Sequence, residues 1–70
     1  MAETIQNNVH EFRAKRSVTQ EQLAEAVGVT RQTIIAIEKG SYAPSVFLAL
    51  KIAGFFKKNV QEIFYISYEK

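Results

Sequence analysis

The 70-residue sequence predicts one small all-α domain that spans residues 1–70, and three features lead to this prediction. Apolar residues recur at helical spacing along most of the chain. Ser, Thr or Asn precedes the apolar segments, where such residues cap helix N-termini. Glycines and a proline lie between the segments and mark turns. We expect five helices, one from Asn7 or Asn8 to about residue 16 and the others over residues 20–27, 31–39, 46–56 and 60–64.

The stretch over residues 19–40, TQEQLAEAVGVTRQTIIAIEKG, organises the rest of the chain. Thr19 and Gln22 have the spacing of a capping box at the start of a helix. The apolar residues of that helix follow at helical spacing: Leu23, Ala24 and Val27. Gly28 comes next, where the helix must stop and where a left-handed backbone favours glycine.

A second helix follows directly within the same stretch. Thr30 is its predicted cap, and Gly40 is its predicted end. Its apolar residues are Ile34 and Ile37, with Val29 in the turn before it. Ala24, one turn before Gly28, is small enough for the two helices to cross steeply. This combination is typical of the helix-turn-helix of DNA-binding proteins, and an ordinary αα-hairpin of a small bundle is the alternative.

Turn and capping residues also delimit the remaining elements. Pro44 disfavours helix at the residue before it, and Ser45 can cap the long apolar helix that follows. Asn59 can cap the short fifth helix. Residues 1–6 are mixed in character, so we expect them to fray or to lie extended. Residues 65–68 favour extended structure, which predicts a short extended C-terminal tail.

Composition limits the chemistry that the chain can perform. No cysteine is present, and the single His10 rules out a histidine-rich metal centre. No catalytic constellation, phosphate loop or cofactor site is evident, so an enzyme is not predicted. No apolar run approaches the ~20 residues that span a bilayer, so we expect a soluble, cytoplasmic protein that binds no membrane. A net charge of +2 and a pI near 9.1 favour an anionic partner.

The whole pattern resembles the Cro/C1-type (XRE-type) helix-turn-helix repressors in their minimal single-domain form. The resemblance covers about residues 8–64, and its most specific pieces are TQEQLA, VGVTRQTI, IEKG, PS, LKIA and VQEIF. It implies a compact five-helix, lambda-repressor-like fold with the motif on the second and third helices. It also implies double-stranded DNA as the partner, bound by a homodimer on a two-fold symmetric operator to repress transcription.

In such a motif, the N-terminal part of the third helix enters the major groove of DNA. The residues expected to read bases are Arg31, Gln32, Thr33, Ile35 and Ala36. Arginine can pair with guanine, and glutamine with adenine, through two hydrogen bonds each. Ala36 departs from the family, because many members carry a longer polar side chain at that position. The alternative is that Arg31 and Gln32 are only solvent-facing helix residues.

Phosphate contacts are expected on either side of that helix. The resemblance assigns Gln20, at the N-terminus of the second helix, a phosphate contact and a bond to Arg31. Thr30 can serve both as a helix cap and as a phosphate donor. The remaining candidates end the first helix or follow the third: Arg16, Lys39, Ser41 and Tyr42. An ordinary surface role is the alternative for each of these residues.

Two further sets of residues have expected structural roles. Family members place an ion pair between the first and third helices at the positions of Arg13 and Glu38, so we expect both to stabilise the fold. The expected dimer interface comprises Phe64, Tyr65, Ile66 and Tyr68. These side chains present more apolar surface than a 70-residue monomer readily buries. The alternative is that the aromatic rings pack on Phe12 or Phe56 in the core.

The leading hypothesis is a sequence-specific DNA-binding regulator of transcription, with no small-molecule ligand. One alternative is the antitoxin of a toxin–antitoxin pair, although the chain lacks the disordered, charged tail that often wraps a toxin. Another is a protein-interaction module that keeps the fold without reading DNA. An acidic or uncharged third helix would favour that module, so Arg31, Gln32 and Thr33 argue against it.

Overall fold

A computed structural model of the chain describes residues 2–69, so Met1 of the expected extended start lies outside the described range. Seven elements follow one another: β1 (Ala2–Asn7), α1 (Val9–Lys15), α2 (Gln20–Val27), α3 (Arg31–Lys39), α4 (Val46–Phe56), α5 (Val60–Ile63) and β2 (Phe64–Glu69). The predicted order of five helices is therefore confirmed. The chain is mostly helical, but it also forms a two-stranded sheet that the all-α prediction did not contain.

The predicted capping residues begin the helices of the central motif. The Thr19 hydroxyl accepts the Gln22 backbone N–H at 3.0 Å, and the Gln22 side-chain oxygen accepts the Thr19 backbone N–H at 2.9 Å. The Thr30 hydroxyl caps α3 in the same manner, and α2 and α3 each end at a glycine with positive φ, 78° at Gly28 and 82° at Gly40. Both helices of the motif therefore begin and end at the residues that the sequence predicts.

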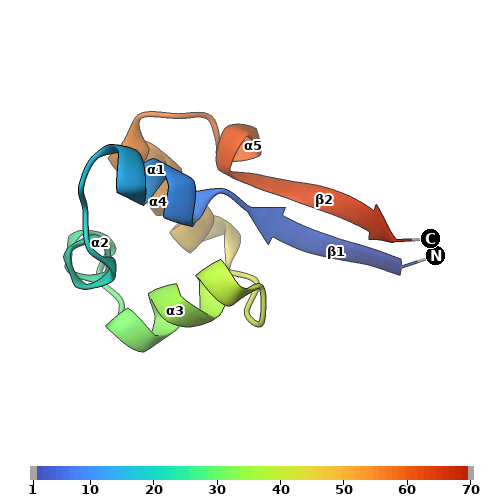
Figure 1. The fold of residues 1–70 in the computed structure, drawn as a ribbon, viewed down its shortest axis with the longest axis horizontal. Coiled ribbons are helices and arrows are strands. Elements are labelled where there is room, and N and C mark those ends of the chain that lie inside the picture. The colour runs from blue at the N-terminus through green and yellow to red at the C-terminus, as the bar shows by residue number, and fades with distance from the viewer. Residues whose placement is uncertain (1, 70) are drawn as a thin grey trace.

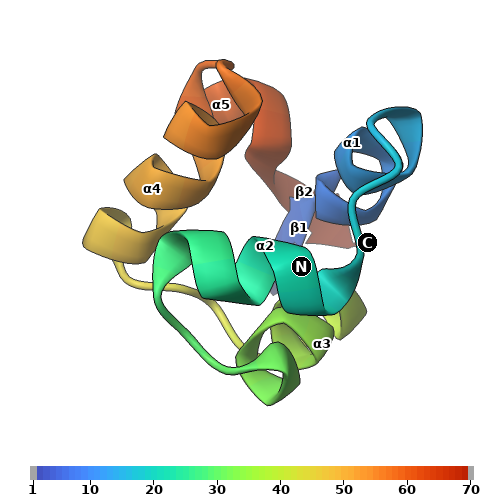
Figure 2. The same ribbon diagram turned by 90° about the vertical axis from the view of Figure 1, so that its left-hand side faces the viewer.

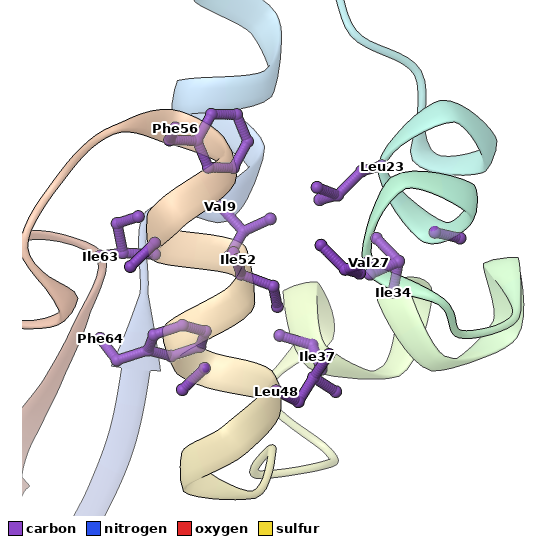
Figure 3. Packing of buried hydrophobic residues seen from close by; sticks show 13 residues of the cluster. Val9, Leu23, Val27, Ile34, Ile37, Leu48, Ile52, Phe56, Ile63 and Phe64 are labelled. Atoms are coloured by element: carbon purple, nitrogen blue, oxygen red, sulfur yellow. The ribbon is translucent and has the colours of Figure 1, made fainter.

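The helices pack around one core. Figure 2 shows α2 crossing in front with α3 below it, and α1 and α4 on opposite sides of this pair. Figure 3 shows side chains from these helices meeting between them. The buried residues come from every helix and from the start of β2: Val9, Leu23, Ala24, Val27, Ile34, Ile37, Leu48, Ala49, Ile52, Ala53, Phe56, Ile63 and Phe64. The apolar faces predicted from helical spacing thus form the core.

Phe64 corrects one expectation about the dimer interface. It is only 8% exposed and belongs to the core, whereas the fifth helix ends one residue earlier, at Ile63, than the sequence predicts. Figure 3 places the Phe64 ring against α4. As the first residue of β2, Phe64 has a side chain that alternates toward the helices, and burial of its ring stabilises the monomer.

The two chain ends form an antiparallel ribbon. Ile5 lies opposite Ile66, and Glu3 lies opposite Tyr68. Figure 1 shows this ribbon extending away from the helices, which agrees with dimensions of 36 × 22 × 22 Å. The short extended C-terminal tail that the sequence predicts is therefore a strand of this ribbon. The segment AETIQN lacks a clear apolar alternation, so the sequence gives little sign that residues 2–7 pair with it.

Asn7 fixes the junction between the ribbon and the helices. Its side-chain oxygen accepts the Val9 backbone N–H at 3.1 Å, and its amide nitrogen donates to the Ile37 carbonyl oxygen at 2.8 Å. Of the two predicted caps for α1, Asn7 rather than Asn8 therefore supplies the side-chain bond. The same side chain also satisfies a carbonyl group in the last turn of α3.

Candidate nucleic-acid interface

The outer face of α3 carries most of the residues expected to read bases. Five residues share the side of this helix that lies opposite the buried Ile34 and Ile37: Arg31, Gln32, Ile35, Ala36 and Lys39. Arg31 and Gln32 are exposed in the first turn, and Ile35 and Ala36 are half-buried behind them. The face carries two cationic side chains, and the nearby carboxylate of Glu38 is paired with Arg13 at 2.7 Å and is only 9% exposed. The face therefore suits an anionic partner.

Thr33 is placed differently from the other four candidates. Its hydroxyl oxygen lies 3.1 Å from that of Thr30, and its backbone N–H donates to the Thr30 hydroxyl at 3.2 Å. Helical spacing turns its side chain away from the outer face of α3, and Thr33 is half-buried. The Thr30 hydroxyl thus caps α3, while Thr33 belongs to the cap rather than to the outer face.

An open depression of about 770 Å³ lies beside the N-termini of α2 and α3. Thr19 and Gln20 from the start of α2 line it together with Arg31 from α3. The first backbone N–H groups of α2 have no partners within the helix, and the helix dipole favours an anion there. Gln20 and Arg31 therefore line the same depression. Among residues 2–69, however, the expected hydrogen bond between Gln20 and Arg31 is not formed.

Gln20 instead belongs to a polar network around Glu38. The Arg13 guanidinium donates to both carboxylate oxygens of Glu38, from Nε at 2.7 Å and from Nη2 at 3.1 Å. The Gln20 amide donates to the same carboxylate at 3.1 Å. The ion pair implied by the family resemblance is thus present, and it joins α1 to α3. Gln20 adds α2 to this connection.

Burial and hydrogen bonding act in opposite directions on Glu38. The carboxylate side chain is only 9% exposed, and this burial by itself raises the pKa of Glu38. The hydrogen bonds from Arg13 and Gln20, with the charges of Arg13 and His10, outweigh burial and lower the pKa of Glu38 below its ordinary value of 4.5. The same pairing with Glu38 raises the pKa of Arg13. Both groups are therefore held in their charged forms.

We expect Glu38 to make stability depend on pH in the acid range. Because the pKa of Glu38 is lower in the folded protein, the unfolded chain binds the proton first as pH falls. The stabilisation is complete above the ordinary pKa of 4.5 and is lost as pH falls from there through the folded-state value. Melting temperatures of the wild type and Glu38→Gln, measured from about pH 3 to 7, should converge at the acid end. The exposed Glu25→Gln is the matched control, and an equal convergence there would contradict this prediction.

Arg16 is held by another helix. Its guanidinium donates to the carbonyl oxygens of Phe56 at 2.7 Å and Phe55 at 3.3 Å, and it lies 5.7 Å from the centre of the Phe56 ring. These carbonyl groups end α4, where unpaired acceptors and the helix dipole favour a cation. Arg16 therefore caps the C-terminal end of α4, and we leave it out of the candidate interface.

The end of α3 and the turn after it carry the other expected phosphate contacts. Lys39, the last residue of α3, is exposed, and Tyr42 in the turn is 47% exposed. The Ser41 hydroxyl donates to the Ala36 carbonyl oxygen at 3.2 Å, so its hydrogen is already bonded to a carbonyl group near the C-terminal end of α3. Lys39 and Tyr42 thus remain the free candidates on this side of the outer face.

His10 is a member of the network that sequence reasoning placed only on the surface. Its side chain is 70% exposed, yet its Nδ1 lies 3.0 Å from Arg13 Nη2 and 3.8 Å from a Glu38 oxygen. The signal for this contact was its position three residues before Arg13, which puts both side chains on one face of α1. His10 also lines the depression that Arg31 and Gln20 share.

The fold and the outer face of α3 together define a helix-turn-helix domain, with α2 and α3 as the motif. A family model described as helix-turn-helix matches residues 9–63. The chain belongs to the Cro/C1-type (XRE-type) helix-turn-helix family of transcriptional regulators. Within residues 2–69, none of the helices has the length and apolar character needed to cross a membrane.

Several known proteins are similar to this chain. It is 49% identical over 65 residues to the uncharacterized HTH-type transcriptional regulator YgzD of Bacillus subtilis (strain 168). The aligned region covers 93% of this chain and 98% of that relative. It is 30% identical over 57 residues to the cryptic phage CTXphi transcriptional repressor RstR of Vibrio cholerae. This aligned region covers 81% of this chain and 51% of that relative. The crystal structure of the restriction-modification controller protein C.AhdI from Aeromonas hydrophila superposes with a TM-score of 0.71 at 28% identity, covering 77% of this chain and 78% of that one.

Proposed function

We propose that this protein is a sequence-specific double-stranded DNA-binding repressor that acts in the cytoplasm as a homodimer on a two-fold symmetric operator. The observation that supports it best is the outer face of α3, where Arg31 and Gln32 are exposed in the first turn while Glu38 of the same helix is paired with Arg13. In a helix-turn-helix domain, this part of the second motif helix reads bases in the major groove. The similarity to a transcriptional repressor of Vibrio cholerae supports the direction of regulation.

Phosphate contacts on two sides would orient α3 in the groove. On one side, the depression lined by Gln20 and Arg31 lies at the N-terminus of α2, where free backbone N–H groups can bind a phosphate oxygen. On the other side, Lys39 at the C-terminal end of α3 and Tyr42 in the turn after it are exposed. Thr30, at the start of α3, lies between these two regions and can donate its hydroxyl hydrogen to a phosphate.

Selection of bound sequences from a random duplex pool tests this proposal. We expect a two-fold symmetric consensus with half-sites whose centres lie about 34 Å apart, because two α3 helices must enter successive major grooves on one face of DNA. Recovery of a single unpaired half-site would support DNA reading but contradict the homodimer. No enrichment over the starting pool at low salt would contradict the whole proposal, and the interaction module would then explain the fold better.

A further inference from the structure

We infer that His10 contacts a DNA phosphate and that its protonation sets the charge of the depression lined by Gln20 and Arg31. DNA binding should therefore become tighter as pH falls from about 8 to about 6, the range in which histidine gains its charge. This inference rests on the proposed function, which puts a phosphate in that depression. It adds a residue of α1 to the contacts that the two motif helices make.

His10 reaches the depression from the first helix. It lies in the first turn of α1 and lines the depression together with Gln20 and Arg31. Figure 2 shows α1 and the start of α2 on the same side of the molecule, joined by the loop between them. The His10 side chain is 70% exposed, so its ring is open to a ligand. A phosphate oxygen bound in the depression would therefore have this imidazole as a neighbour.

Arg13 determines which nitrogen of the His10 ring carries the hydrogen. A guanidinium group has only donors, and Arg13 Nη2 lies 3.0 Å from His10 Nδ1. Nδ1 must therefore accept this hydrogen bond, which leaves the hydrogen of the neutral ring on Nε2. Among the side-chain hydrogen bonds of residues 2–69, none uses His10 Nε2. The Nε2–H group is thus a free donor for a phosphate oxygen.

Protonation keeps this donor and gives it a charge. The protonated ring is a donor at both nitrogens, so Nδ1 no longer accepts from Arg13. A carboxylate oxygen of Glu38 lies 3.8 Å from Nδ1 and offers an acceptor for the new hydrogen. Nε2–H remains available, now on a cationic ring. Hydrogen bonds from a charged donor are about twice as strong as neutral ones, so the protonated ring binds phosphate better.

The charges around His10 make its proton decisive. Four charged groups contact His10 or line the depression with it: Arg13 from α1, Glu21 from the start of α2, and Arg31 and Glu38 from α3. Two of these groups are cationic and two are anionic, so their charges cancel. The depression is therefore close to neutral while His10 is neutral. Protonation of His10 makes it cationic, which favours a phosphate.

The same pH range leaves the other side chains of the site unchanged. His10 is the only histidine among the 70 residues, and cysteine is absent. Burial raises the pKa of Glu38, but the hydrogen bonds from Arg13 and Gln20 outweigh burial and lower it below 4.5, so this carboxylate stays ionised. The amino terminus also titrates in this range, but all variants of position 10 share it.

Affinity for a random-sequence duplex at low salt, measured at pH 8 and at pH 6, tests the inference. The wild type should bind about threefold to tenfold more tightly at the lower pH. The dependence of log K on log salt should also steepen by about one for each bound copy. His10→Gln should show no such gain, because its amide is neutral at both pH values. His10→Lys should show none either, because its ammonium is charged at both.

Moving the histidine provides the matched control. The double variant that combines His10→Gln with Gln61→His has the composition of the wild type. Gln61 is exposed on α5, which Figure 1 shows at the edge of the molecule opposite α3. This variant should bind no more tightly at pH 6 than at pH 8. Circular dichroism at both pH values should show folded protein for every variant, because both positions are exposed.

Nuclear magnetic resonance of the wild-type ring gives a second measurement. The single histidine makes its ring signals unambiguous. Because proton binding and DNA binding are reciprocally coupled, the duplex should raise the pH at which the ring is half protonated. The rise should equal the logarithm of the affinity gain between the neutral and the protonated protein. A ring whose titration the duplex does not change would contradict the inference.

The outcomes separate this inference from the proposed function. If His10→Gln keeps the gain at pH 6, another group causes it and the inference is wrong, while the proposed function stands. A gain in the double variant would show that net charge alone is responsible, which also overturns the inference. Equal affinity of the wild type at both pH values has the same consequence. Absence of wild-type binding to any duplex at low salt would contradict the proposed function itself.

Discussion

Arg13→Ala is expected to lower the free energy of unfolding by about 2–3 kcal/mol. Arg13 donates to both oxygens of Glu38 and, through Nη1, to the Val18 carbonyl oxygen at 2.9 Å, so it joins α1, the loop before α2 and α3. Without it, a carboxylate that is 9% exposed keeps, among residues 2–69, Gln20 as its remaining side-chain hydrogen-bond donor. The network lies near the protein surface, which keeps the loss below the roughly 3–5 kcal/mol of a fully buried pair.

Urea unfolding of the two single variants and the double variant measures this effect. Glu38→Ala should also destabilise the protein, because it leaves the Arg13 guanidinium, 12% exposed, without its carboxylate. The double variant should lose much less than the sum of the two single losses, because either change alone already breaks the pair. The exposed Arg31→Ala is the control and should change stability by less than about 0.5 kcal/mol. Additive losses would show that Arg13 and Glu38 do not stabilise the fold through each other.

The central motif could be predicted from the sequence because its signals are local. A capping box needs only Thr19 and Gln22, and a glycine that ends a helix needs only its own backbone freedom at Gly28 or Gly40. The buried sides of α2 and α3 follow from apolar residues within two or three turns. Such features depend on neighbours within about four residues, so they can be read without knowing the rest of the fold.

The features that the sequence did not predict depend on contacts between distant segments. The β1–β2 sheet pairs the two ends of the chain, and neither Ile5 nor Ile66 indicates the other in the sequence. The sequence indicates no partner for Arg16, whereas in the structure its Nη2 donates to the Phe56 carbonyl oxygen at 2.7 Å, at the end of α4. Phe64 could belong to an exposed tail or to the core, and only its position at the start of β2 decides. Tertiary contacts of this kind override local expectation.

The candidate site was predictable to an intermediate degree. Helical spacing is sufficient to put Arg31, Gln32 and Lys39 on one side of α3, and the structure leaves that side open. Helical spacing did not predict the contact of Gln20, because its hydrogen bond to Glu38 joins two different helices. Polar residues at helix ends have several partners within reach, and packing determines which partner they meet.

Arg31→Ala and Gln32→Ala are expected to reduce the preference of the protein for its operator over scrambled DNA, each by about 1–3 kcal/mol. Both side chains are exposed in the first turn of α3, the part of this motif that reaches base edges. A two-bond contact to a guanine or an adenine forms only on the correct base, so its loss weakens operator binding and hardly affects random DNA. The measurement is the affinity of each variant for operator and scrambled duplexes.

Lys39→Ala is the matched control for these two variants. Lys39 is exposed on the same side of α3, but it lies in the last turn, where DNA phosphates rather than bases are near. Its removal should weaken binding to all duplexes alike and reduce the dependence of log K on log salt by about one. If Arg31→Ala and Gln32→Ala leave the ratio of operator to scrambled affinity intact while Lys39→Ala lowers both affinities, α3 touches the backbone without reading bases. Sequence recognition would then have to come from the shape of the DNA, because phosphate contacts carry no direct sequence information.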